Sequence, residues 1–159
     1  MGLEVAFSKN QRRLTVKHSQ PGKPVEIIVM EAHSGGWFAH RPLPTGQWLI
    51  VENPRGYRSY FGLFYQDNKV NDQFKHDKEW RDGIRFGFHS ATGSHGCIMA
   101  RPTAGQSYID AQNAWARIQA LIRTQRPRKV ITYQNNENPS LLDNTKYCIM
   151  SYGHMAVSD

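Results

Sequence analysis

Cysteine is scarce in this chain, which has Cys97 and Cys148 among its 159 residues. Two cysteines are too few for a disulfide scaffold, and neither shows the paired Cys/His spacing of a structural zinc site. Cys148 lies in the apolar, strand-like segment KYCIMSY, and we expect it to be a core residue. The sequence therefore predicts no metal and no cofactor, and it leaves Cys97 as the thiol that requires an explanation.

Long apolar runs are also missing. The first seven residues, MGLEVAF, have neither the basic start nor the continuous apolar stretch of a secretory signal peptide. No other segment approaches the length of a membrane-spanning helix, and there is no internal repeat or low-complexity tract. We therefore expect no membrane span and no classical signal peptide.

Apolar residues make up 39% of the chain, which is enough for one core of ordinary size. We therefore expect a single domain over residues 1–159. The formal net charge of +7 attracts anions such as nucleic acid, anionic lipid or the polymers of a bacterial cell wall. Because Lys and Arg are dispersed and no nucleic-acid-reading motif is present, we expect no nucleic-acid partner.

Alternating apolar residues predict a mainly β protein. Strand patterns cover residues 3–7, 14–16, 25–29, 47–52, 57–66, 84–88, 129–134 and 146–152. One main helix is predicted before Pro127 from apolar residues at helical spacing, namely Tyr108, Ala111, Trp115, Ile118 and Ile122. Residues 103–106 have the pattern of its capping box. Residues 67–83 are polar and mixed in charge, which is typical of a long solvated connection that could cover a site.

The segment around Cys97 is dense in residues that support nucleophilic catalysis. A thiol becomes a nucleophile when a nearby imidazole takes its proton and stabilises the thiolate. Two histidines are candidates, because His95 lies two residues from Cys97 and His89 ends a predicted strand eight residues upstream. A structural role is the usual one for a cysteine near a histidine. The local density of chemical groups nevertheless favours Cys97 as the nucleophile of an enzyme.

Serine and glycine residues complete this segment. Gly93 and Gly96 leave the backbone free to turn sharply and to present N–H groups to an oxyanion. Ser90 and Ser94 could orient an imidazole, and we expect Ser94 and Gly96 to bind the oxyanion or the substrate.

A phosphatase loop fits the residues around Cys97 less well. Its His directly precedes the Cys, and five residues separate its Cys from its Arg, whereas Arg101 lies only four positions after Cys97 here.

The motif Ser94-His95-Gly96-Cys97-Ile98 resembles the signature of the L,D-transpeptidases, the YkuD-like family. Residues 42–50, PLPTGQWLI, are similar to the family's Pro-x-Gly-x-aromatic-x-Ile segment, and residues 89–90, HS, resemble its upstream His-Ser pair. The likeness covers roughly residues 3–134, which leaves residues 135–159 as a C-terminal strand extension. It implies a β-sandwich-like catalytic domain with Cys97 as nucleophile, His89 as base and the backbone of Ser90 orienting His89.

Three arginines could hold a substrate carboxylate through bidentate contacts, namely Arg81, Arg85 and Arg101. The strand pattern places Arg85 on the face opposite the apolar residues, so the alternative to carboxylate binding is that Arg85 simply faces solvent. The resemblance adds an oxyanion hole made by the backbone amides around Gly96 and Cys97.

Only residues 90–93 separate His89 from Ser94, whereas the family commonly has well over ten residues between these two positions. This compressed spacing keeps His95 open as the alternative base. The short loop resembles the branch that includes type VI secretion L,D-transpeptidase effectors, toxins that are delivered into rival bacteria. That resemblance implies secretion without a classical signal peptide and action in the periplasm or cell wall. The implied partners are an immunity protein and a component of the secretion machine.

The family's chemistry implies that Cys97 attacks the L,D bond of peptidoglycan tetrapeptide stems and keeps the acyl group as a thioester. Release to water, to a diaminopimelate amine or to a free D-amino acid gives carboxypeptidation, 3–3 cross-linking or exchange, and the sequence leaves these three open. Two rival interpretations remain. One is a cysteine amidase or peptidase that cuts another stem bond, and the other is a non-catalytic module that binds the cell wall.

Overall fold

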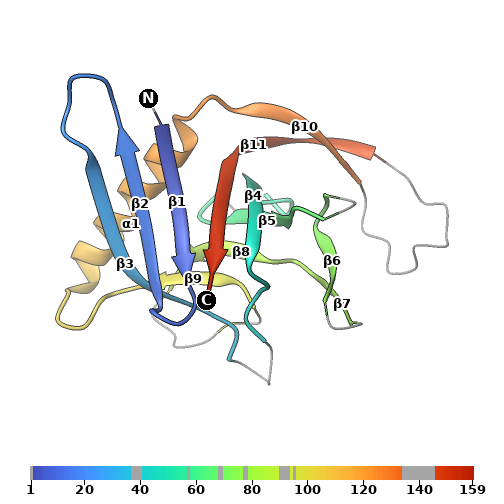
Figure 1. Ribbon diagram of the computed structural model, residues 1–159, viewed down its shortest axis with the longest axis horizontal. Helices are drawn as coiled ribbons and strands as arrows, with labels where there is room; N and C mark the ends of the chain where they lie inside the picture. The colour runs from blue at the N-terminus through green and yellow to red at the C-terminus, as the bar shows by residue number, and fades with distance from the viewer. Residues whose placement is uncertain are drawn as a thin grey trace.

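The computed structural model describes residues 2–36, 41–56, 58–67, 70–76, 79–89, 94, 96–133 and 146–159. These residues form strands and one helix, α1 (Tyr108–Arg123), as Figure 1 shows. The strands are β1 (Gly2–Ser8), β2 (Arg13–Ser19), β3 (Glu26–Ser34), β4 (Gly46–Glu52), β5 (Phe61–Tyr65), β6 (Gln73–His76), β7 (Glu79–Asp82), β8 (Arg85–Phe88), β9 (Ile98–Arg101), β10 (Arg128–Tyr133) and β11 (Lys146–Ser158).

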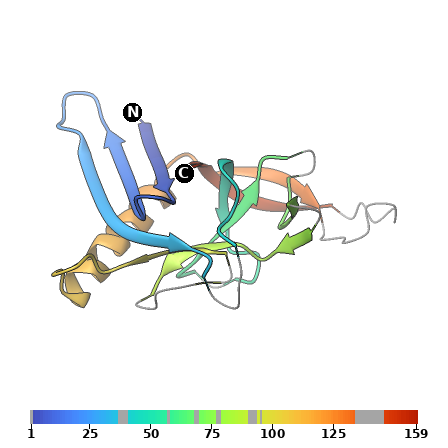
Figure 2. The same ribbon diagram turned by 60° about the horizontal axis from the view of Figure 1, so that its bottom comes forward.

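Nine of these strands pair in one sheet, in the order β1-β2-β3-β9-β8-β5-β4-β11-β10. β11 also pairs in parallel with β1, from Val5 opposite Met155 to Ser8 opposite Ser158. Because β11 is bonded to β4 on its other side, this pairing closes the sheet on itself. Figures 1 and 2 both show β1 and the end of β11 side by side, with β3 curving beneath them toward β9.

Helix α1 packs its apolar face against the sheet, behind β1 to β3 in Figure 1. Four of the residues that the helical spacing predicts are buried, namely Ala111, Trp115, Ile118 and Ile122, and Leu121 is buried with them. The fifth, Tyr108 in the first turn, is 49% exposed, which corrects its expected place on the apolar face. The ring of Trp115 lies 5.0 Å from that of Phe86. The helix begins later than predicted, because the Ser107 side chain accepts the backbone N–H of Asp110 at 3.1 Å. The predicted capping box at residues 103–106 instead closes a turn ahead of the helix, where the Gln106 side chain accepts the Thr103 N–H at 3.0 Å.

Residues 67–83 contain two strands that the sequence did not predict. β6 and β7 pair antiparallel, from Gln73 opposite Asp82 to His76 opposite Glu79. Phe74 anchors them, with its ring 5.1 Å from that of Trp48 and 5.8 Å from that of Tyr65. A single buried aromatic residue in a polar segment gives no alternating pattern, so the sequence indicated a solvated loop.

The mainly β class with one main helix is confirmed. A two-layer sandwich is not confirmed, because the paired strands of the described residues continue through one closed sheet. β11 belongs to this sheet as a partner of β1, β4 and β10. The expectation that Cys148 is a core residue is wrong. It is exposed and lies opposite Ile131, whose side chain is also exposed, so the outer face of β11 is apolar without being buried.

No helix in the described part of the chain combines the length and the apolar character that crossing a membrane would require.

Candidate active site

Cys97 lies immediately before β9, beside the start of β8. These two strands are parallel, with Phe86 opposite Ile98, so Cys97 stands level with Arg85. The backbone N–H of Arg85 donates to the Cys97 Sγ at 3.2 Å, and the thiol lies 3.8 Å from the carbonyl oxygen of Gly83. The backbone of residues 83–85 therefore fixes the position of the sulfur.

Ser94 anchors the backbone on both sides of Gly96. Its Oγ accepts the N–H of Gly35 at 3.0 Å and that of Gly96 at 3.2 Å, and it donates to the Cys97 carbonyl at 2.7 Å. Ser94 is only 3% exposed, so its hydroxyl is shielded from solvent. Ser94 is a positioning residue here. A direct contact with substrate, as the sequence suggested, would require this network to open.

Gly96 occupies a position that only glycine suits. Its φ is 106°, a conformation that side chains with a Cβ rarely adopt, and a Cβ would collide with the guanidinium of Arg81. Its carbonyl accepts the Ser34 hydroxyl at 2.6 Å, and Ser34 in turn accepts the Leu43 N–H at 3.1 Å. Its own N–H donates to Ser94. The amide that the sequence assigned to an oxyanion hole is therefore already hydrogen-bonded within the protein.

Arg81 on β7 lies across Gly96. Its guanidinium donates to the carbonyl oxygens of Arg41 at 2.9 Å and Pro42 at 3.3 Å, and it lies 5.3 Å from the centre of the Phe74 ring. The β6–β7 pair thus brings a cation to the segment that carries the thiol.

Burial raises the pKa of the Cys97 thiol above its usual value. The Arg85 N–H and the charges of Arg85 and Arg81 lower this pKa, but burial is the largest effect. Because the thiolate is the reactive form, a base must still remove the proton before Cys97 can attack.

Arg85 is buried, at 8% exposure, which corrects the expectation of a solvent-facing side chain. Its guanidinium makes a bidentate contact with Asp72, at 2.6 and 2.8 Å, and its Nε donates to Asn53 at 3.1 Å. The alternation of the strand correctly predicted that Arg85 points away from the apolar face. It could not predict that Asp72 and Asn53 cover the side chain on the other face. A substrate carboxylate would have to displace Asp72.

His89 and Arg101 lie at the opposite end of the β8–β9 pair from Cys97. The His89 N–H donates to the Ala100 carbonyl at 3.1 Å, so His89 stands level with Arg101, four residues beyond the level of Cys97. At about 3.3 Å per residue this separation is roughly 13 Å along the strands. The His89 ring lies instead 6.0 Å from that of His33. The structure does not bring His89 to Cys97, and its assignment as base stays a prediction.

Three predicted residues, Ser90, Gly93 and His95, lie outside the described residues. Ser34 and Asp72 belong to the site, and sequence reasoning missed both. Ser34 gave only a turn signal with the two glycines that follow it, and Asp72 lay in a segment interpreted as a solvated loop. Among the described residues, no group of three or more His, Cys, Asp or Glu side chains is arranged to hold a metal ion.

Comparison with known proteins does not assign a family, because neither a family model nor a curated protein matches the sequence. Among solved structures, the chain is similar to one described as "Structure of Bdellovibrio bacteriovorus Bd1075", with 17% identity and a TM-score of 0.40 over 77% of this chain. The chain spans 56% of the length of that protein. A likeness this distant carries no conclusion about function.

Proposed function

We propose that this protein is a cysteine acyltransferase or hydrolase that acts on the L,D bond of peptidoglycan tetrapeptide stems, with Cys97 as its nucleophile. The observation that supports it is the setting of the thiol. The sulfur accepts a backbone N–H at 3.2 Å, follows a glycine at φ 106° and lies in the field of two arginines. The SHGC motif, which resembles that of the L,D-transpeptidases, supplies the substrate class and the finer assignment to a β-sandwich-like catalytic domain of that family.

The reaction proceeds by acyl transfer through the Cys97 sulfur. After a base has taken its proton, the thiolate attacks the carbonyl carbon between the L-centre and the terminal D-residue, and a C–S bond forms. The C–N bond then breaks, and the amine of the D-residue leaves with the proton that the base held. Water or an amine attacks the thioester, which releases the acyl group and returns the proton to the sulfur.

The proton acceptor is a histidine, and two are candidates. His89 stands about 13 Å from Cys97 along the strands, as the register and a rise of about 3.3 Å per residue require. His95 is separated from Cys97 by one residue in the chain. The register of β8 and β9 therefore favours His95, while the family resemblance favours His89.

The biological setting belongs to the same proposal. The short segment between His89 and Ser94 resembles that of type VI secretion effectors, which supports an antibacterial toxin that acts on the cell wall of a rival. The net charge of +7 favours approach to an anionic wall. An immunity protein and a secretion-machine component would be its partners, and export would need no classical signal peptide.

The test is mass spectrometry of purified tetrapeptide muropeptides after incubation with wild-type and variant proteins. We expect wild-type protein to remove or exchange the terminal D-alanine, Cys97→Ala to do neither, and the matched control Cys148→Ala to match wild type because Cys148 is exposed and distant in sequence. Loss of the base lowers turnover by about 10²–10⁴-fold. We expect that loss for His95→Ala; the same loss for His89→Ala alone would transfer the role to His89.

Two results would contradict the proposal. Cleavage of a different stem bond that requires Cys97 would indicate an amidase or a peptidase. Unchanged muropeptides with wild-type protein, together with retention on peptidoglycan, would indicate a binding module.

A further inference from the structure

A pocket of about 440 Å³ opens beside the segment that carries Cys97. Its walls come from the β1–β2 turn, from the end of β3 and from Arg101 at the end of β9. We propose that this pocket, called the cationic pocket below, binds a carboxylate group of the peptide that Cys97 attacks. The inference rests on the proposed function and adds to it the feature of the substrate that is recognised.

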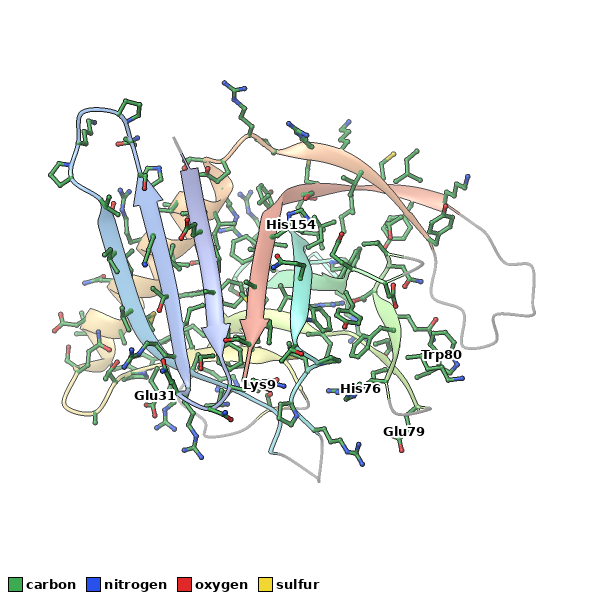
Figure 3. All side chains as sticks on the ribbon, viewed as in Figure 1. Lys9, Glu31, His76, Glu79, Trp80 and His154 are labelled. Atoms are coloured by element: carbon green, nitrogen blue, oxygen red, sulfur yellow. The ribbon has the colours of Figure 1, made fainter. Side chains whose placement is uncertain are left out.

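Charge is the first argument. Lys9, Arg12 and Arg101 line the pocket, against Glu31 as the acidic residue among its lining residues. Lys9 is paired with Asp159 at 3.1 Å, and both of these groups have exposed surface. In Figure 3 the labelled Lys9, which follows β1, and Glu31, which lies in β3, are both toward the lower edge of the molecule. The excess of cations gives the pocket a positive potential that attracts a carboxylate.

An unsatisfied donor is the second argument. The Nε of Arg101 is buried and has no hydrogen-bond partner among the described residues; it forms an ion pair with the Glu31 carboxylate at 3.6 Å, which is longer than a hydrogen bond. Buried donors in proteins are nearly always hydrogen-bonded, because a buried donor without a partner destabilises the folded state. A carboxylate that enters the pocket can accept from this guanidinium in the bidentate geometry that arginine favours.

The β1–β2 turn is the third argument. Arg12 has a φ of 50°, and among the described residues it is the one non-glycine residue with a positive φ. Such a conformation persists where surrounding contacts enforce it. Here the Arg12 carbonyl accepts the N–H of Ala32 on β3 at 3.0 Å, and the Lys9 N–H donates to the Ser158 carbonyl at 3.0 Å. The turn is therefore held in place with Lys9 and Arg12 at the pocket before any ligand binds.

The pocket is close enough to Cys97 for one peptide to reach both. Ser34 lines the pocket and also donates to the Gly96 carbonyl at 2.6 Å. Arg101 is four residues from Cys97 along an extended strand, or roughly 13 Å, which an extended peptide of about four residues spans. The recognised carboxylate must therefore lie within about four residues of the attacked carbonyl.

The experiment measures binding separately from turnover. Cys97→Ala protein is titrated calorimetrically with a tetrapeptide stem and with a series in which one carboxylate at a time is converted to the amide. We expect one amide to bind about tenfold more weakly than the parent peptide, as loss of one charge-assisted contact implies. Adding Arg12→Gly and Arg101→Gln should abolish this difference. Arg12→Gly leaves the turn intact because glycine accepts a φ of 50°.

Arg126→Gln in the same Cys97→Ala protein is the matched control, because Arg126 is exposed and does not line this pocket. We expect it to retain the full tenfold discrimination between free carboxylate and amide. Equal affinity for all peptides, no detectable binding, or the same loss in the Arg126→Gln control would overturn the inference. Failure of the proposed function has a different signature, namely wild-type protein that leaves the terminal D-alanine in place whatever the pocket binds.

Discussion

At the scale of single residues, the Cys97 thiol is subject to two opposing effects. Burial favours the neutral thiol and raises its pKa, whereas Arg81 and Arg85 favour the thiolate. Arg85 is bound bidentately by Asp72, so a carboxylate already offsets much of its charge. Arg81 donates to two carbonyl oxygens instead. Arg81 is therefore the cation whose removal should change the reactivity of Cys97 most directly.

We expect Arg81→Met to raise the pKa of the Cys97 thiol further, because the thiolate loses a favourable charge while burial of the sulfur persists. Alkylation by iodoacetamide, followed against pH in a Cys148→Ser background, should then be slower at neutral pH and reach its maximum at higher pH. Lys75→Met removes a charge from β6 and should leave the profile unchanged. An Arg81→Met profile identical to that of the parent would show that this guanidinium does not act on the sulfur.

At the scale of elements, the sequence predicts best where one periodic pattern meets one face of the core. Helix α1 and strands β1, β2, β4 and β8 follow their patterns to within a few residues. β6 and β7 were missed because Phe74 is the only apolar residue buried in them, and its buried neighbour Gln73 is polar. The site follows the same rule. Cys97 was evident from local density. The hydrogen bonds of Ser94 and Gly96 to residues 34–35 join positions about sixty residues apart in the chain, and no local pattern encodes them.

The β6–β7 pair depends on Phe74 for its docking, since an isolated two-stranded pair is marginal in water. Burial of a Phe side chain is worth about 1.5–3 kcal/mol. Phe74→Ala should therefore reduce the hydrogen-exchange protection of residues 79–82 by about 10- to 100-fold. It should also lower the rate of thioester formation, because Arg81 leaves Gly96 when β7 undocks. Trp80→Ala, at a residue that is 37% exposed, is the matched control; equal protection in the two variants would show that β7 is held by other contacts.

At the scale of the whole molecule, closure of the sheet makes sequence-distant strands interdependent. β11 contacts β1 on one side and β4 on the other, and Met155 stands opposite both Val5 and Trp48. The segment regarded from sequence as a C-terminal extension thus completes the sheet that carries β8 and β9. Displacing it would expose the core on which the position of Cys97 depends.

Met155→Ala should accordingly destabilise the entire fold. Met155 is fully buried, and truncation of a buried Met to Ala costs about 2–5 kcal/mol. Because one closed sheet links both ends of the described chain, chemical denaturation followed by far-UV circular dichroism and by tryptophan fluorescence should show one shared transition at lower denaturant. His154→Ala changes the exposed neighbour and should shift stability by less than about 0.5 kcal/mol. Two separate transitions in Met155→Ala would mean that β10 and β11 unfold as a unit apart from the rest, and that the strands around Cys97 keep their structure without them.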